Sequence, residues 1–302
     1  MKFALVTAVA VAALAGPALA GGADQEVRIR HAVARVVVIV EDRTDVAVEI
    51  EQGGAGLPAL EVTRRGRNLR IDGGLGGRRF AGIRFNNDDI RDCRAGPDDA
   101  RQPGEGASVT VRNIGRVNVS DAPLIVLRTP REVEVYVEGA VFGAIGRGAT
   151  AIDFGNGGCG SWTVANTGDL DISQAGSGNI RTGTSDRLDI SLAGSGAVRA
   201  GATRNLDVSI AGSGDVYVAA VDGPVDVSIA GSGDVTVGGG QVGSLDVSIA
   251  GSGDVDIRAV AASADVSIMG SGDVKITGVT GSVERAIMGS GSVTIGDHTY
   301  DR

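Results

Sequence analysis

Aspartates recur at two fixed places in a repeated phrase of the sequence, typified by residues 206–218, LDVSIAGSGDVYV. Asp207 precedes the Gly-Ser-Gly triplet of this phrase, and Asp215 follows it directly. Equal positions of a stacked repeat lie one above another, so each set would form a column of carboxylates. Hard cations such as calcium prefer oxygen ligands of this kind. The candidate metal ligands are therefore Asp207, Asp215, Asp226, Asp234, Asp246, Asp254, Asp265 and Asp273.

Stacked carboxylates need relief from their own repulsion. Two unit charges about 4.8 Å apart, the spacing between strands, repel by roughly 0.9 kcal/mol in water. Solvation, hydrogen bonds from nearby serines or backbone amides, raised pKa values or bound cations could each supply the relief. The nine-residue calcium repeat of toxin-type β-rolls does not match this phrase. Solvated columns and calcium-binding columns therefore both remain open, and calcium is the only cofactor considered.

Catalysis by these carboxylates is the third interpretation, because a pair of them at the right separation can cleave glycosidic bonds. The aspartates repeat uniformly, however, and no copy stands out as a single site. His31 and His298 lie near opposite ends of the mature chain, and no Gly-x-Ser-x-Gly nucleophile motif with ordered partners is apparent. We therefore expect no enzyme and no catalytic residues, with a polysaccharide-active β-helix enzyme as the second alternative.

The repeat itself predicts the elements that must position the aspartates. The first glycine of each triplet falls at 176, 194, 212, 231, 251, 270 and 289, a period of 18–20 residues. Leu206, Val208 and Ile210 alternate with polar or small residues, which is typical of a strand with one buried face. The glycines suit a sharp corner, and Val216 resumes the alternation. The predicted fold is all-β, a single-stranded, right-handed parallel β-solenoid whose coils have 18–20 residues.

The remaining chain divides into three further segments. Residues 1–20 have the short positive start, apolar run and small-residue end of a signal peptide. Residues 21–72 read as an N-terminal β-strand region, and residues 73–107 as a long loop rich in Gly, Arg and Asp. The solenoid is expected over residues 108–302. Its inner columns are expected to be Leu206, Val225, Leu245 and Ala264, and Ile210, Ile229, Ile249 and Ile268.

The signal sequence places the mature protein in the periplasm, outside the cell or at the cell surface. No other stretch is long and apolar enough to span a membrane. An oxidising compartment favours a disulfide between Cys93 and Cys159, with two free thiols as the alternative. Such a bond would fasten the loop to an early coil.

Charge is unevenly distributed along the chain. Residues 165–302 hold 17 acidic and 8 basic side chains and account for the whole formal net charge of −9. An acidic solenoid disfavours nucleic acid as a partner and favours cations or basic partners. Ten arginines crowd the preceding region, which is either a solvated surface or an anion-facing patch: 64, 65, 67, 70, 78, 79, 84, 91, 94 and 101.

Three motifs together resemble a known family. They are Asn68-Leu69-Arg70-Ile71, the strand Val135-Tyr136-Val137 and the serial Gly-Ser-Gly-Asp-Val copies. The pattern resembles the family described as "putative auto-transporter adhesin, head GIN domain", over roughly residues 33–295. The resemblance implies an exported bacterial β-helix protein. The 73–107 insertion departs from it, and we expect no translocating barrel within these 302 residues.

The functional hypothesis is a non-enzymatic binding or adhesion scaffold of the cell envelope. Its repeated face would contact a cell-surface or envelope component, either a polysaccharide or another protein, through many weak equivalent sites. Self-association through the solenoid ends is a further expectation. A calcium-binding acidic solenoid is the first alternative.

Overall fold

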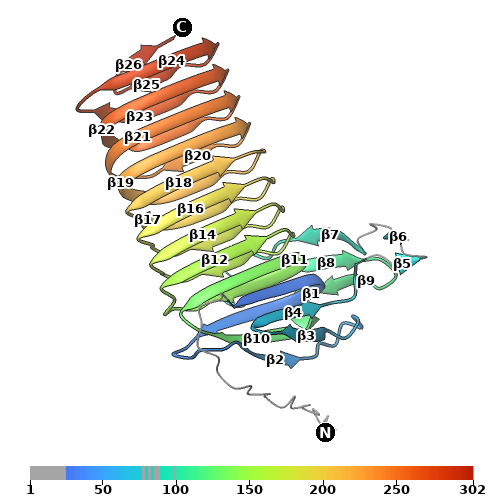
Figure 1. Cartoon of the computed structure of the whole chain (residues 1–302). Coiled ribbons are helices and arrows are strands. Elements are labelled where there is room, and N and C mark those ends of the chain that lie inside the picture. Colours follow the sequence, from blue (N-terminus) through green and yellow to red (C-terminus); the bar gives the residue numbers. More distant parts are fainter. Residues whose placement is uncertain (1–24, 77–78, 81–82, 85–88, 98–99, 302) are drawn as a thin grey trace.

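The computed structural model is a rod of stacked β-strands that rises from a broader N-terminal end (Figure 1). It describes residues 25–76, 79–80, 83–84, 89–97 and 100–301, so the predicted signal peptide lies outside the described residues. The N-terminal end contains β1 (Glu26–Val40), β2 (Ala47–Glu51), β3 (Glu61–Arg65), β4 (Asn68–Asp72), β5 (Arg79–Phe80), β6 (Ile83–Arg84), β7 (Ile90–Arg94), β8 (Ser108–Val111), β9 (Gly115–Asn118), a short 3₁₀ turn (Val119–Asp121) and β10 (Leu124–Thr129).

The rod continues through the longer series of strands. These are β11 (Glu132–Ile145), β12 (Ala151–Asn156), β13 (Trp162–Val164), β14 (Asp169–Gln174), β15 (Ile180–Thr182), β16 (Arg187–Leu192), β17 (Val198–Thr203), β18 (Asn205–Ile210), β19 (Val216–Gly231), β20 (Val235–Val237), β21 (Gly240–Gly251), β22 (Val255–Gly270), β23 (Val274–Val279), β24 (Val283–Gly289), β25 (Val293–Ile295) and β26 (His298–Tyr300).

Consecutive coils pair in parallel, copy against copy. Leu206 of β18 aligns with Val225 of β19, and the same positions continue into β21 and β22. The second strand of each coil forms its own parallel ladder, as Val216 with Val235 shows. Both predicted inner columns are buried, with every member at most 4% exposed. The predicted β-solenoid is therefore confirmed, with about nine turns.

Two polar side chains occupy the inner column that holds isoleucine in later coils. Asn156 and Gln174 are each 1% exposed and align with Leu192 and Ile210 in that column. Asn156 Nδ2 donates to the carbonyl oxygen of Gly160 at 3.0 Å, and Gln174 Nε2 donates to that of Gly178 at 2.7 Å. These bonds offset the cost of burying the two amide nitrogens, so both side chains brace the early corners from inside.

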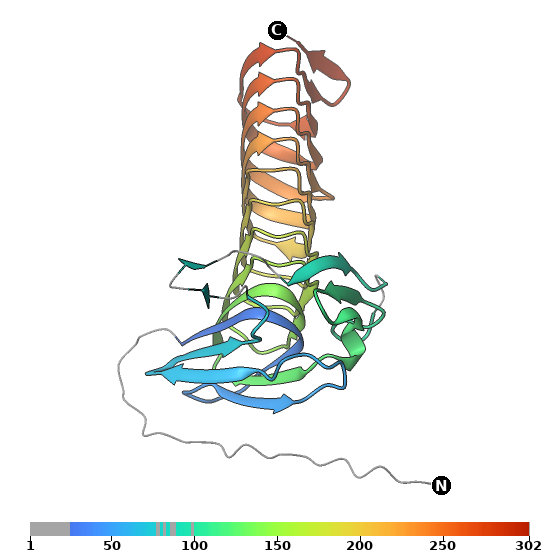
Figure 2. The ribbon, with the colours of Figure 1, turned by 90° about the vertical axis from the view of Figure 1, so that its right-hand side faces the viewer.

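The N-terminal strands form both the first rungs and a cover, as Figure 2 shows from the side. β1 pairs in parallel with β10, β11 and β4, so it is part of the coil stack. β2 then pairs antiparallel with β10, and β3 antiparallel with β4. These pairings cover strand edges that would otherwise be open to other chains.

The segment expected to be one long loop over 73–107 is only partly loop. Residues 90–94 form β7, which pairs antiparallel with β8, and β8 pairs with β9. The expected solenoid boundary at 108 differs for the same reason, since β8 and β9 belong to this three-stranded sheet. Val109, Val111 and Val117 supply its buried face, which packs on Phe142 of β11. Most apolar residues of this sheet lie beyond residue 107. That part of the chain was expected to belong to the solenoid, so the sheet was not predicted.

The C-terminal end is closed by side chains and a short hairpin. β26 pairs antiparallel with β25, so the polar tail covers one edge of the last coil. Arg285 aligns with Val266, in a column that is buried in earlier coils, and its guanidinium lies 4.0 Å from the ring centre of Tyr300. An inward-register charge of this kind discourages further strands from stacking on the end.

Candidate functional site

One column of acidic side chains runs along the outer face of the first strand of every coil. Residue by residue, the parallel ladders place Glu26, Glu134, Asp153, Asp171, Asp189, Asp207, Asp226, Asp246, Asp265 and Glu284 in one register. We call this set the acidic column. Four of the predicted ligands, at 207, 226, 246 and 265, belong to it. The alternation of buried and exposed positions keeps its carboxylates on the outer face.

The N-terminal half of the acidic column has its own partners. Tyr136 donates its hydroxyl to Asp153 Oδ2 at 2.7 Å, and burial followed by this contact raises the pKa of Tyr136. Arg187 contacts Asp189 through two nitrogens, at 2.8 and 3.3 Å. Burial and then the neighbouring carboxylates raise the pKa of Asp171 and Asp207, and the charge of Arg187 opposes part of this rise. Repulsion in this half is therefore partly offset by protein donors.

The C-terminal half of the acidic column lacks such partners. Within the described part of the chain, no hydrogen bond or ion pair reaches the side chains of Asp226, Asp246, Asp265 or Glu284. Partial burial and then the charges of Asp207 and Asp246 raise the pKa of Asp226. This half therefore holds concentrated negative charge that no cation among the described side chains neutralises.

A groove follows the acidic column along the rod. Its volume is about 500 Å³, and Arg187 and Asp189 stand at its N-terminal end. Its lining is mainly oxygen-bearing: Asp189, Asn205, Asp207, Asp226, Ser244, Asp246, Ser263, Asp265, Ser282 and Glu284, with Pro224 and the edges of inner-column residues. We call this feature the acidic groove. Carboxylates and hydroxyls in a shallow channel suit a cationic group, because such a group can pair with more than one of them.

The second set of predicted ligands forms a different structure at the coil corner. Asp215 Oδ1 accepts the backbone N–H of Asp234 at 3.2 Å, and Asp234 Oδ1 accepts that of Asp254 at 2.9 Å. Asp254 and Asp273 accept the next two amides in turn, each at 2.8 Å, and the ladder ends at Ser292. Each of these carboxylates therefore has a backbone donor on the neighbouring coil, and the column stabilises the corner.

The structure does not bring the two aspartate columns together. Only the acidic column lines the groove, while the 215 column lies at the corner between the two strands of the coil. Among the residues described, no group of three or more His, Cys, Asp or Glu side chains could hold a metal ion. A cage combining Asp207 with Asp215 does not fit this arrangement. The acidic column alone is the candidate for cation binding.

The two histidines lie on different elements. His31 sits at the bulge of β1, with a φ of 50°, and its Nδ1 is 3.5 Å from Asp72 Oδ1. His298 is exposed on β26. Burial opposes ionisation of Asp72, but hydrogen bonds from Arg70 and the Gly74 amide, with His31 nearby, leave its pKa lowered. The histidines therefore form no pair, and His31 helps to hold the connection after β4.

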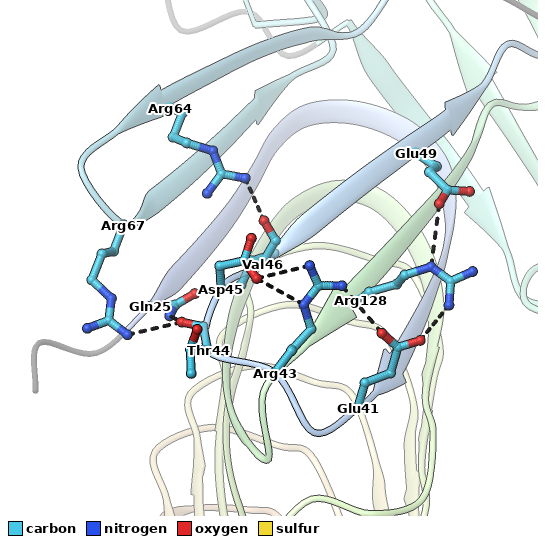
Figure 3. Close-up of polar contacts among 10 residues, drawn as sticks. All are labelled: Gln25, Glu41, Arg43, Thr44, Asp45, Val46, Glu49, Arg64, Arg67 and Arg128. Carbon is cyan, nitrogen blue, oxygen red and sulfur yellow. Dashed lines mark hydrogen bonds and ion pairs between the residues drawn. The ribbon is translucent and has the colours of Figure 1, made fainter. Parts of the chain in front are cut away.

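Two arginines of the crowded region, which was expected to be a solvated surface or an anion-facing patch, make contacts that fasten the N-terminal end. Arg64 donates to the carbonyl oxygen of Val46 at 2.6 Å, and Arg67 donates to that of Thr44 at 3.2 Å (Figure 3). Both arginines thereby tie the β3–β4 hairpin to the β1–β2 connection. Arg91, Arg94 and Arg101 are exposed, Arg78 lies outside the described residues, and the side chains of Arg79 and Arg84 are not described.

Two arginines, Arg43 of the same connection and Arg128 of β10, bridge acidic side chains at this end. Arg43 contacts Asp45 at 3.0 Å and Glu41 at 3.4 Å, and Arg128 contacts Glu41 at 2.5 Å and Glu49 at 3.4 Å (Figure 3). These contacts form one network across β1, β2 and β10. A network of this kind holds long side chains more firmly than isolated surface pairs do.

Cys93 of β7 and Cys159, at the corner before β13, form a disulfide. Both cysteines pack against the small core of the β7–β9 sheet. The bond thus fastens the inserted sheet to an early coil.

Neutralising one carboxylate in the middle of the acidic column should stabilise the fold. Asp226→Asn keeps the shape of the side chain and removes repulsion from Asp207 and Asp246. We expect the free energy of unfolding at neutral pH to rise by roughly 1 kcal/mol, the size of one neighbour interaction in water. Chemical denaturation measures this quantity. Asp297→Asn, exposed outside the column, is the control, and equal effects of the two variants would contradict the expectation.

The same column sets a pH dependence. The raised pKa of Asp171, Asp207 and Asp226 means that these carboxyls bind more protons in the folded than in the unfolded chain. Between the ordinary value of 3.8 and the raised pKa, their contribution to stability therefore increases as the pH falls. As the pH falls through this window, the free energy of unfolding from chemical denaturation should gain less from this effect in Asp226→Asn than in the unaltered protein.

Comparison with known proteins gives one family. Its model matches residues 28–240 and 224–298, which together cover most of the chain. A search of curated proteins finds no match. The Gly-Ser-Gly-Asp-Val coils and the strands of the N-terminal end both fall within the matched range. The chain therefore belongs to the family described as "Putative auto-transporter adhesin, head GIN domain".

Proposed function

We propose that the protein is an exported, non-enzymatic binding scaffold of the cell envelope, and that its acidic groove contacts a cationic part of its partner. The observation that carries this proposal is the run of Asp226, Asp246 and Asp265, which are aligned in one groove and have no ion pair with any described side chain. The partner is a cell-surface or envelope component, a protein or a polysaccharide, that presents amines or bound cations.

The repeated spacing supports binding at many equivalent positions. One carboxylate per coil gives sites about 4.8 Å apart along a rigid rod. Each contact is weak because it is exposed to water, but several held on one scaffold add to the total affinity. Concentrated negative charge also speeds the encounter with a positive partner. The family's description as an adhesin agrees with this mode of action.

Export is supported by the sequence of residues 1–20 and by the Cys93–Cys159 disulfide, which suits an oxidising compartment. Within the described residues, no helix is long and apolar enough to cross a membrane. We propose the periplasm or the cell surface as the site of action.

The triple variant Asp226→Asn, Asp246→Asn, Asp265→Asn tests the groove. A fluorescent lysine-rich peptide should bind the unaltered protein and lose at least tenfold in affinity for this variant, about the effect of one lost charged contact. The matched control is Asp42→Asn, Asp297→Asn, Asp301→Asn, because these exposed aspartates lie outside the groove and the change in net charge is the same. Equal loss in both variants would mean that only total charge matters.

The same variants test the biological claim. Cells that express the triple groove variant should lose surface or cell–cell attachment, whereas cells with the control variant should keep it. The adhesion role would be rejected if cells that express either variant, and cells that lack the protein, all attached as well as cells with the unaltered protein.

Calcium is the second candidate, because Asp226 and Asp246 are stacked and neither pairs with a described cationic side chain. Calcium binding to the folded state would raise the melting temperature by mass action. We would then see a higher melting temperature with Ca²⁺ than with chelator in the unaltered protein and no difference in the triple groove variant. No shift in either protein removes the calcium candidate and leaves the cationic partner standing.

A further inference from the structure

Two methionines occupy neighbouring coils at the C-terminal end of the rod, on β22 and β24 (Figure 1). Met269 and Met288 are direct partners in the parallel ladder that joins these strands. Their side chains are 62% and 66% exposed. The same register position holds alanine in the two preceding coils, at Ala230 and Ala250. We call Met269 and Met288 the methionine pair.

Packing does not account for the methionine pair. Ile268, beside Met269, is 1% exposed, and Ile287, beside Met288, is partly buried against the core. Because side chains alternate along a strand, both methionines therefore lie on the outer face. A side chain left in water gains none of the stabilisation that apolar burial provides. Alanine already serves the ladder at this position one coil earlier, so the fold does not require a longer side chain here.

The methionine pair offers two thioether sulfurs to one ion. Neighbouring strands of the ladder are about 4.8 Å apart. A zinc–sulfur bond is about 2.3 Å long, and two bonds of that length in line span about 4.6 Å. The rotatable bonds of methionine let both sulfurs turn toward an ion between them. Thioethers are soft ligands, which select copper(I) over calcium or magnesium.

We propose that the methionine pair binds a soft monovalent metal ion of the copper(I) class between its two sulfurs. Asp265 and Glu284 are on the same outer face of the same two strands, and their charge attracts a cation to this end of the rod. A thioether has no proton to lose, so this site needs no deprotonation before it binds. The methionines do not line the acidic groove, so the site stands independently of the proposed function.

Other roles fit the methionine pair less well. An apolar docking patch needs more apolar surface, but the outward residues that precede the pair are Ser267 and Ala286, and glycines follow it. A hard cation prefers the carboxylates of the acidic column to uncharged sulfur. A soft ion is the ligand that two sulfurs on adjacent coils can hold without further side chains.

The test titrates silver(I), a soft monovalent ion, into the protein without residues 1–20, labelled with ¹³C in the methionine methyl groups. Both methyl signals should shift together and saturate at one ion per chain. Met288→Leu keeps the size of the side chain and should lower the affinity at least about tenfold, since even outer partners of a metal site are commonly worth that factor. Copper(I), added without oxygen, should displace silver from the same site.

Moving the pair by one coil is the sharper test. Ala250 is exposed and aligned with Met269, so Ala250→Met in the Met288→Leu background should restore binding. Ala262→Met in that background is the matched control, because Ala262 is exposed on β22 but outside the column. It has the same number of methionines and should restore nothing. Circular dichroism checks that each variant is folded.

Four results would overturn the proposal. Silver(I) that leaves the methyl signals unmoved would exclude the site, and equal recovery in the two rescue variants would show that only the number of methionines matters. A tenfold loss of affinity from about pH 7.5 to 5.5 would identify a titrating ligand such as His298. Loss of silver binding in the triple groove variant would place the ion in the acidic groove, whereas unchanged methyl shifts in that variant would support the methionine pair.

Discussion

Gly251→Ala should destabilise the rod by roughly 3 kcal/mol, from a steric clash and an unfavourable backbone conformation together. A Cβ built on Gly251 would lie 2.0 Å from the carbonyl oxygen of Gly231 in the coil below. The φ of Gly251 is 150°, which L side chains rarely adopt. In the next coil, a Cβ built on Gly270 would likewise lie 2.0 Å from the carbonyl oxygen of Gly251. The first glycine of the triplet is therefore required by coil stacking as well as by the corner.

Chemical denaturation of Gly251→Ala and of Ser252→Ala measures the effect. Ser252 is exposed, and its backbone N–H donates to the carbonyl oxygen of Gly231 whatever the side chain. Removal of the Ser252 hydroxyl should therefore change the free energy of unfolding little. Unfolding of a stacked repeat need not be a single transition, and hydrogen exchange of β21 and β22 should show where protection is lost. A Gly251→Ala protein as stable as Ser252→Ala would mean that neighbouring coils can separate at the corner without cost.

The repeat made the solenoid predictable because stacking uses the same residues in every copy. The alternation of Leu206, Val208 and Ile210 predicted a buried face, and the register of the ladders follows from the fixed period. Trp162 occupies the position of Val216 in the repeat, which indicates a core residue, and it is 1% exposed. Its indole N–H donates to the carbonyl oxygen of Val141 at 2.7 Å.

The acidic column is longer than the sequence pattern indicated. Glu134 and Asp153 lie in degenerate copies of the repeat, and aligning those copies strictly would have added both. Glu26 could not be found in this way, because β1 joins the stack from a distant part of the chain. Such a pairing depends on three-dimensional closure and leaves no periodic signal in the sequence.

The role of the aspartate column that begins at Asp215 could be determined only from the geometry of the coil corner. Asp215 and Asp207 are equally regular in sequence, yet one set accepts backbone amides at the corner and the other faces a groove. The difference arises because a corner turns backbone N–H groups of the next coil toward the side chain, whereas a strand uses those groups in the ladder. The buried amides of Asn156 and Gln174 were missed for a similar reason, since their partners are corner carbonyls.

Loss of the Cys93–Cys159 disulfide should free the β7–β9 sheet from the coil. The bond joins two cysteines that are 66 residues apart in the sequence. In the chain-entropy account, a loop of that length contributes about 4 kcal/mol to stability. Without the bond, the sheet is held on β11 mainly by its small apolar core, including Val109 and Phe142. We therefore expect local detachment of β7, β8 and β9 to precede unfolding of the rod.

Limited proteolysis and hydrogen exchange of a Cys93→Ser, Cys159→Ser variant distinguish local from global loss. The amides of β7, β8 and β9 should lose protection, whereas those of β22 should exchange as in the unaltered protein, because no disulfide touches the later coils. Reduction of the unaltered protein should reproduce the result. Equal protection of β8 with and without the bond would show that the apolar core alone holds the sheet. Uniform loss along the rod would show instead that the inserted sheet is needed to start the stack, since solenoid stability passes from coil to coil.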